Sequence, residues 1–82
     1  MSASIDWSAP AELYSSIATF KTRNSRYKRF PSAAEAVRFA IEDLPAASLR
    51  ALAIESGDNR HEGEAIRALY MAEDYPLQRP ER

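Results

Sequence analysis

The sequence contains no cysteine, only two glycines and no long apolar run. Without cysteine, the chain has no disulfide, no thiolate nucleophile and no sulfur ligand for zinc or an iron–sulfur cluster, and a cytoplasmic location fits this composition. Gly57 and Gly63 are too few to build a glycine-rich phosphate loop. No stretch reaches the roughly 18 apolar residues of a membrane helix, and residues 1–20 lack the pattern of an export signal. We therefore expect neither membrane insertion nor export.

An excess of charge of one sign is also missing, because 11 basic residues nearly balance 12 acidic ones. The whole molecule therefore has no field that would draw it to nucleic acid or to an anionic membrane. With 45% apolar and 28% charged residues, the composition is that of an ordinary globular protein. Its 82 residues suit one small domain, close to the size at which a single core supplies only about 3–5 kcal/mol. We place this domain at residues 11–77, between flexible ends at 1–10 and 78–82.

The clearest element is a helix that begins at Ala33. Ser32 and Glu35 form a capping box, in which each side chain satisfies an amide that the first turn leaves unpaired. Pro45 ends the helix, because the residue before a proline is pushed out of the α region. At about 100° per residue, one side carries an apolar stripe that we expect to face the core. The stripe consists of Ala33, Ala34, Val37, Ala40, Ile41 and Leu44. Phe39 projects from the opposite, charged side.

Residues 16–30 are expected to form a β-hairpin. Apolar, β-branched and aromatic residues become denser toward Phe20, which favours a first strand at residues 16–22. Asn24 and Ser25 are typical turn residues between two strands.

The loop length decides which residues face each other in this hairpin. A loop of two or four residues would set Lys21 opposite Lys28, an unfavourable pair of like charges. A loop of three or five residues instead pairs Phe20 with Phe30, and we predict this register. It gathers a basic stripe with one aromatic ring on the outer face, next to Thr19. The members of the stripe are Lys21, Arg23, Tyr27 and Arg29.

The segment from Ala46 to Glu55 fits two interpretations. It has high helix propensity and Gly57 could stop a helix there, but it also fits a strand with apolar side chains on both faces. Residues 56–60 are expected to be a loop in either case. A last helix is predicted over residues 62–72, with Ile66, Leu69 and Tyr70 toward the core. Met71 faces away from that core.

The motifs resemble those of a group of short uncharacterised bacterial proteins, chiefly from alphaproteobacteria. The run YKRF–SAAEAVRFAIEDLP, then EGEAIRALY and DYPL, is similar to the patterns YxRF-x-TAAEAIRFAxEELP and G-x-x-IRxLY-x-x-x-DYPL of that group. The resemblance covers residues 27–77. It implies a strand at Leu49 to Glu55, although Ala51 and Ala53 depart from the pattern of the group. The group has no assigned function, so the resemblance implies none.

His61, the only histidine, is the one residue that could suggest catalysis. It lies near Asp58, Glu62 and Glu64, but three hard metal ligands at a defined spacing are not evident, and the calcium-loop pattern is missing. No serine lies in a nucleophile-elbow context. We therefore expect a surface histidine near a helix start, and a protein that is not an enzyme and has no catalytic residue, cofactor or metal.

Together these elements predict an α+β fold in the order ββαβα. The basic hairpin and one further strand would form a three-stranded sheet, with two helices on one face. If the hairpin's second strand and the third strand are parallel, the connection between them would be a right-handed crossover. The alternative is a small helical bundle, in which Ala46 to Glu55 is helical.

Two functional hypotheses follow. The first is a small cytoplasmic protein-interaction or regulatory module, which would use Phe39 and Met71 as an apolar surface for an unknown partner or for a second copy of the chain. The second is a weak nucleic-acid-binding domain that uses the basic stripe, where cations would contact phosphates and Tyr27 would stack on a base. Against the second hypothesis, exposed hairpins often carry basic residues only to prevent edge-to-edge pairing.

Overall fold

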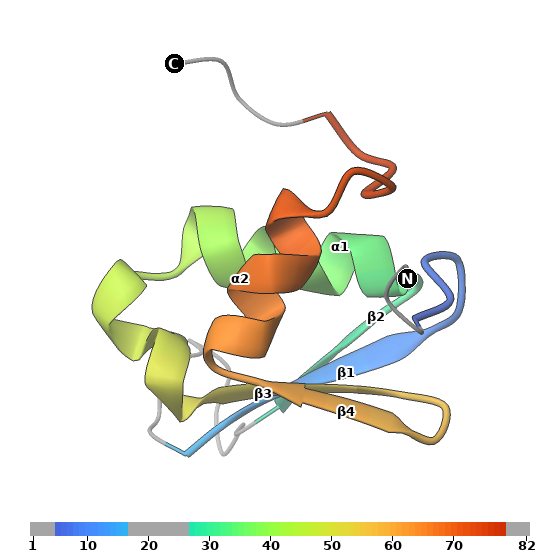
Figure 1. Ribbon diagram of the computed structural model, residues 1–82. Helices are drawn as coiled ribbons and strands as arrows, with labels where there is room; N and C mark the ends of the chain where they lie inside the picture. The colour runs from blue at the N-terminus through green and yellow to red at the C-terminus, as the bar shows by residue number, and fades with distance from the viewer. Residues whose placement is uncertain (1–4, 17–26, 79–82) are drawn as a thin grey trace.

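The computed structural model describes residues 5–16 and 27–78, and over these residues the protein is an α+β domain (Figure 1). Its four strands are β1 (Ala11–Ser15), β2 (Tyr27–Phe30), β3 (Leu52–Ser56) and β4 (Asn59–Glu62). They form an antiparallel sheet in the order β2-β1-β3-β4. Helices α1 (Ala33–Arg38) and α2 (Glu64–Met71) lie on one face of it (Figure 1). The predicted α+β class is therefore confirmed, whereas the sheet has four strands rather than three and the helical bundle is wrong.

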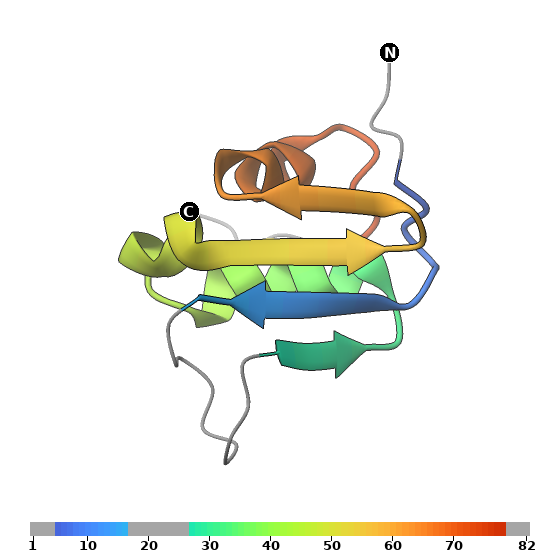
Figure 2. The ribbon, with the colours of Figure 1, turned by 90° about the horizontal axis from the view of Figure 1, so that it is seen from below.

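Strand β1 lies inside the sheet and has two different faces. Its sequence alternates, so that Ala11, Leu13 and Ser15 are buried while Glu12 and Tyr14 are partly exposed. It pairs with β2 on one side and with β3 on the other (Figure 2). Alternation of this kind fixes a strand's register, because a slip by one residue would turn every side chain to the other face.

The predicted hairpin register is wrong. Phe30 lies opposite Ala11 and not Phe20, because the strand that pairs with β2 is β1, earlier in the chain than the predicted strand at 16–22. Residues 17–26, which include Phe20 and the predicted turn, lie outside the described residues. The predicted strand at 16–22 therefore lies outside the described residues except for Ser16, and the strand that pairs with β2 shows its signal in the alternation of residues 11–15.

The connection from β2 to β3 crosses over the sheet through α1. Both strands are antiparallel to β1, so they run parallel to each other, as the crossover prediction requires. However, β1 lies between them, so the crossover joins strands that are not neighbours.

Helix α1 begins at Ala33, where the sequence places it. The Ser32 hydroxyl oxygen accepts a hydrogen bond from the Glu35 amide at 3.2 Å, which is one half of the predicted capping box. The amides of Ala33 and Ala34 would otherwise be unpaired at the start of the helix. They donate to main-chain carbonyls of residues 9 and 7, at 2.7 and 3.1 Å.

Residues 5–10, which we expected to belong to a flexible end, pack against the domain. Ile5 is buried in the core, and the Trp7 ring is half-buried against Tyr75, with ring centroids 5.3 Å apart and an edge-to-face geometry. The carbonyls of Trp7 and Ala9 extend the capping of α1. The packed body of the described chain therefore starts before Pro10.

After Arg38 the helix widens into the π-helical segment η1 (Phe39–Asp43). With i→i+5 hydrogen bonds, successive residues are related by less than 100° about the helix axis. Residues of the predicted apolar stripe after Arg38 therefore point in other directions than predicted. Val37 is fully buried, as expected, whereas Ile41 and Leu44 are only partly buried against the core.

The ambiguous segment after Pro45 is divided between helix and strand. A 3-10 helix, η2 (Ala46–Ala51), comes first and β3 follows from Leu52. Leu49 is buried within η2 and Ile54 is buried in β3, so both parts of the segment contribute a side chain to the core.

Residues 56–60, expected to be a loop, instead contain the start of β4. Ser56 lies opposite Asn59, so that a two-residue turn of Gly57 and Asp58 joins β3 to β4. Gly57 has φ +59°, a left-handed value that favours glycine. The predicted loop therefore proves to be a tight hairpin.

Helix α2 follows β4 after Gly63, whose φ of +52° turns the chain into the helix. Ile66, Leu69 and Tyr70 are buried, as predicted, and the Tyr70 hydroxyl donates to Glu42 at 2.6 Å. The inner layer lies between the sheet and the helices, where the fully buried large side chains gather. These are Leu13, Val37, Leu52, Ile54 and Ile66.

Candidate functional site

We call the face of the sheet turned away from the helices the outer face; it is the face toward the viewer in Figure 2. The strand registers place two rows of side chains on it. One row crosses the strands as Arg29, Glu12, Glu55 and Arg60, and the other as Tyr27, Tyr14, Ala53 and Glu62. None of the described helices covers this face (Figure 1). The polar and aromatic side chains of this face are therefore not covered by the described helices.

The two tyrosines of the outer face stack on each other. The rings of Tyr14 and Tyr27 lie 5.6 Å apart between centroids, with 25° between their planes. The Tyr14 hydroxyl also donates to Glu12 at 2.7 Å. Tyr14 is thus held by two contacts, whereas Tyr27, on the edge strand, is 46% exposed. Sequence reasoning missed Tyr14 and Glu12 as site residues because it placed the first strand too late in the chain.

Two arginines flank two facing carboxylates. Glu12 lies opposite Glu55 on neighbouring strands, an arrangement that is unfavourable for like charges alone. Arg29 binds Glu12 with its Nε and Nη2 atoms at 3.1 and 2.8 Å. Arg60 binds Glu55, and its Nε donates to Glu62 at 2.6 Å. The arginines therefore compensate the repulsion between the carboxylates.

These contacts shift the pKa values of the groups that make them. The hydrogen bond from Tyr14 and, after it, the contact with Arg29 hold the pKa of Glu12 below its usual range. The same bond raises the pKa of Tyr14, because a phenolate would face the Glu12 carboxylate. The carboxylates raise the pKa values of Arg29 and Arg60. At neutral pH, these four groups therefore keep their usual charge states.

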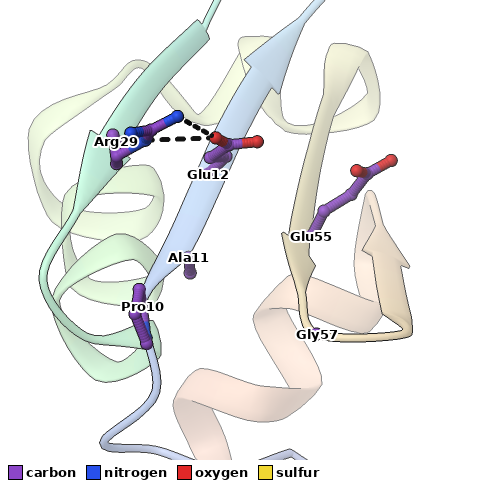
Figure 3. Close-up of a pocket in the computed structure, with 6 residues that line it drawn as sticks. All are labelled: Pro10, Ala11, Glu12, Arg29, Glu55 and Gly57. Carbon is purple, nitrogen blue, oxygen red and sulfur yellow. Dashed lines mark hydrogen bonds and ion pairs between the residues drawn. The ribbon is translucent and has the colours of Figure 1, made fainter.

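A hollow of about 280 Å³ opens at one end of the outer face (Figure 3). It is lined by the start of β1, the β3–β4 turn and three charged residues. The full set is Pro10, Ala11, Glu12, Arg29, Glu55 and Gly57. At this end of the sheet the β1–β3 pairing stops at Glu12 and Glu55. Beyond it, the Ser56 hydroxyl donates to the Pro10 carbonyl at 3.0 Å, a side-chain hydrogen bond that connects the two segments. Figure 3 shows Glu12 and Arg29 joined on one side and Glu55 across from them.

The predicted basic stripe is only partly described. Tyr27 and Arg29 do lie together on the outer face, but the guanidinium of Arg29 is occupied by Glu12. Lys21 and Arg23 lie outside the described residues. Within the described part of the outer face, three carboxylates accompany two arginines, so this surface is not basic.

The two residues of the predicted apolar surface differ in exposure. Phe39 is half-buried, because its ring contacts Phe30 at 5.4 Å and the Lys28 ammonium lies 5.9 Å from its centroid. The prediction that Phe39 points outward fails since it assumed helical periodicity and did not foresee the β2 edge beside it. Met71 is 65% exposed, as expected.

His61 lies in β4 and not at a helix start. It is opposite Ile54, half-buried on the side of the sheet that faces the helices, and its Nε2 atom is buried with no hydrogen-bond partner. Within residues 5–16 and 27–78, no three acidic or histidine side chains gather as metal ligands do.

Comparisons with protein families, curated proteins and solved structures identify no similar protein. In the part of the chain that the structure describes, no helix combines the length and the apolar character needed to cross a bilayer.

Proposed function

We propose that this protein is a small protein-interaction module of the cytoplasm, which binds its partner through the outer face of the sheet. One observation carries the proposal: the stacked pair of Tyr14 and Tyr27 stands on a sheet face that no described helix covers. The proposal includes no catalytic role for His61 or for any other residue. The lack of cysteine supports the cytoplasmic location, since nothing in the chain needs an oxidising compartment.

The tyrosine pair supports binding because of its geometry. Tyrosine is enriched at protein interfaces, where it supplies a large contact area and loses little conformational entropy. Tyr14 is already fixed by its stack on Tyr27 and its bond to Glu12, so binding would not need to order it. The exposed ring of Tyr27 would become covered by the partner.

The charges of the outer face indicate the chemistry of the partner. Three carboxylates, Glu12, Glu55 and Glu62, outnumber the two arginines on this face. Charge complementarity selects partners and speeds their association more than it adds affinity. We therefore expect the partner to present a lysine- or arginine-bearing segment, with a cationic side chain toward the hollow between Glu12 and Glu55.

The test is co-purification from the protein's own host with tagged wild type and the Tyr27→Ala variant. Tyr27 is the more exposed ring of the pair, so its loss should leave the fold intact and reduce the recovered partner at least about tenfold. The recovered protein is then titrated against both forms by calorimetry.

The matched control is Met71→Ala, which truncates the other exposed large apolar residue of the described chain. Met71 is the last residue of α2, a helix on the face of the sheet opposite the outer face (Figure 1). It should leave the recovered partner unchanged. If Met71→Ala abolishes recovery and Tyr27→Ala does not, the binding surface lies on the helical side and the proposal fails.

Weak binding of single-stranded nucleic acid is the second candidate. The exposed ring of Tyr27 favours it, because bases stack on aromatic side chains. The ion pair of Arg29 with Glu12 opposes it, as does the excess of carboxylates on the same face. Fluorescence titration with an oligonucleotide at two salt concentrations separates the candidates. No binding at low salt removes this one, and salt-sensitive binding that Tyr27→Ala abolishes would favour it over a protein partner.

A further inference from the structure

We propose that two copies of this chain join edge to edge through β4, antiparallel and about a twofold axis, so that their sheets become one continuous sheet. This inference goes beyond the outer face and does not depend on the proposed function. It rests on which main-chain groups β4 leaves free and on the order of charges along that strand.

The main-chain groups of Arg60 and Glu62 point away from β3. In an antiparallel pair, every second residue bonds to its neighbour strand. The Gly63 amide donates to the Leu52 carbonyl at 3.1 Å, which continues the register of the β3–β4 pair by one residue. His61 and Asn59, two and four residues before Gly63, therefore also bond to β3. By the same alternation, the amides and carbonyls of Arg60 and Glu62 point away from β3. This is the edge of the sheet, because β4 is an outermost strand (Figure 2).

The charges along β4 are self-complementary in one register. When the twofold axis passes beside His61, Arg60 of each copy lies opposite Glu62 of the other, and both side chains are on the outer face. Each Arg60–Glu62 pair can also exchange two main-chain hydrogen bonds, because these are the residues whose polar groups face outward. Within one chain the Arg60 Nε already bonds to Glu62 at 2.6 Å. Joining the edges would therefore close a ring of alternating charges.

The other edge of the sheet does not offer such a register. A twofold axis beside Lys28 in β2 would set that lysine opposite itself, and an axis beside Arg29 would do the same to the arginine. Like charges directly opposite are destabilising, and edge lysines are a common means of preventing sheet-to-sheet pairing. Of the two edges of the sheet, β4 is therefore the one whose charges suit pairing with a second copy of itself.

Helix α2 is compatible with this assembly. It follows β4 after Gly63 alone and lies behind it in Figure 2, so the twofold axis would bring the two α2 helices together. Its exposed residues include Ala65 and Ala68, whose small side chains allow a close approach. The outer faces of both copies would lie on the same side of the joined sheet.

Sedimentation velocity over a range of protein concentrations tests the proposal. The joined strands are short, so the wild type should form a dimer with Kd on the order of 10–1,000 μM. Arg60→Glu sets two carboxylates opposite each other at each pair, and Glu62→Arg sets two guanidiniums. Each variant alone should dimerise at least about tenfold more weakly. An equimolar mixture of the two should restore dimers, because every facing pair is then of opposite charge.

The controls are Arg38→Glu and Asp43→Arg, which make the same changes of charge at exposed sites far along the chain from β4. Both should dimerise like the wild type, and circular dichroism should show that all variants fold. Restoration in the mixture supports the proposal even if one variant is less stable, since a misfolded chain would not regain an interface. A wild type that stays monomeric at about 1 mM, or a dimer that neither charge reversal weakens, overturns it.

Discussion

The two faces of the sheet alternate along the same strands but are stabilised in different ways. Leu13 and Ile54 on the inner face are fully buried, and the hydrophobic effect fixes them against the helices. Glu12 and Arg29 on the outer face form an ion pair that solvent reaches from one side. We therefore expect the inner face to contribute most of the stability and the outer face little of it, which would leave the outer face available for the binding that we propose.

The largest expected effect comes from breaking the inner face at Leu13. Leu13→Ala removes a fully buried side chain from the centre of the sheet and should cost about 2–5 kcal/mol in the free energy of unfolding. Urea denaturation followed by circular dichroism measures it. That loss is comparable to the whole stability of a domain of this size, so Ile54→Val, expected to cost about 0.5–1.5 kcal/mol, provides a graded second variant. Unchanged stability in both would show that the inner face is not the core.

The next effect concerns the turn that decides which β4 residues lie on which face. Gly57 has φ +59° and its Cβ position is open, so Gly57→Ala meets backbone strain and no clash. The expected loss is about 1 kcal/mol. Gly57→Asn should lose less, because asparagine tolerates left-handed backbone. Thermal unfolding of the three proteins checks this order, and an alanine variant as stable as the wild type would argue against the tight hairpin.

A smaller and pH-dependent effect is expected for Tyr14→Phe on the outer face. The Tyr14–Glu12 bond holds the pKa of Glu12 below 4.5, so its stabilisation is present above pH 4.5 and is lost as the pH falls through the lowered value. It also raises the pKa of Tyr14 above 10.0, so its stabilisation is lost again as the pH rises through the raised value.

The stability difference between wild type and Tyr14→Phe should therefore be steady at neutral pH and narrow at both extremes. Denaturation at a series of pH values measures this difference. In a Glu12→Gln background, the difference in stability caused by Tyr14→Phe should no longer become smaller at acidic pH. If it still becomes smaller there, a carboxyl group other than Glu12 is responsible.

The smallest effect is expected at Arg29. Its side chain is 69% exposed, and exposed ion pairs contribute little because water and salt screen them. Arg29→Ala should leave the melting temperature unchanged within error at physiological salt. A clear loss at both low and high salt would mean that the outer face contributes to folding, and the contrast between the faces would be weaker than we describe.

Local signals predicted where α1 begins and which residues of α2 are buried, but not where α1 ends or that Glu62 belongs to β4. The Ser32 cap and the apolar periodicity placed the start of α1 at Ala33, and the stripe of Ile66, Leu69 and Tyr70 placed α2. Both signals involve only residues that are close together in the sequence, so they can be recognised without knowledge of the tertiary structure.

Pairing and phase were harder to predict. The Gly57–Asp58 turn is a recognised hairpin signal, but a charged strand such as NRHE lacks the β-branched residues that usually accompany one. The change from α-helix to π-helix at Phe39 could not be predicted, because a projection at 100° per residue assumes α-helical geometry throughout. Of the outer face, Tyr27 and Arg29 were predicted as site residues. Tyr14 and Glu12 were not, because they belong to β1 and the first strand was predicted at residues 16–22.

The position of β1 has a consequence for synthesis on the ribosome. This first strand lies in the interior of the sheet and needs β3, and the Trp7 ring needs Tyr75 near the other end of the described chain. Ribosomes add about 5–20 residues per second, so the early segment must wait for several seconds before its partners emerge. During that interval Leu13 and Trp7 are accessible to chaperones, and the domain closes only when nearly the whole described chain has been made.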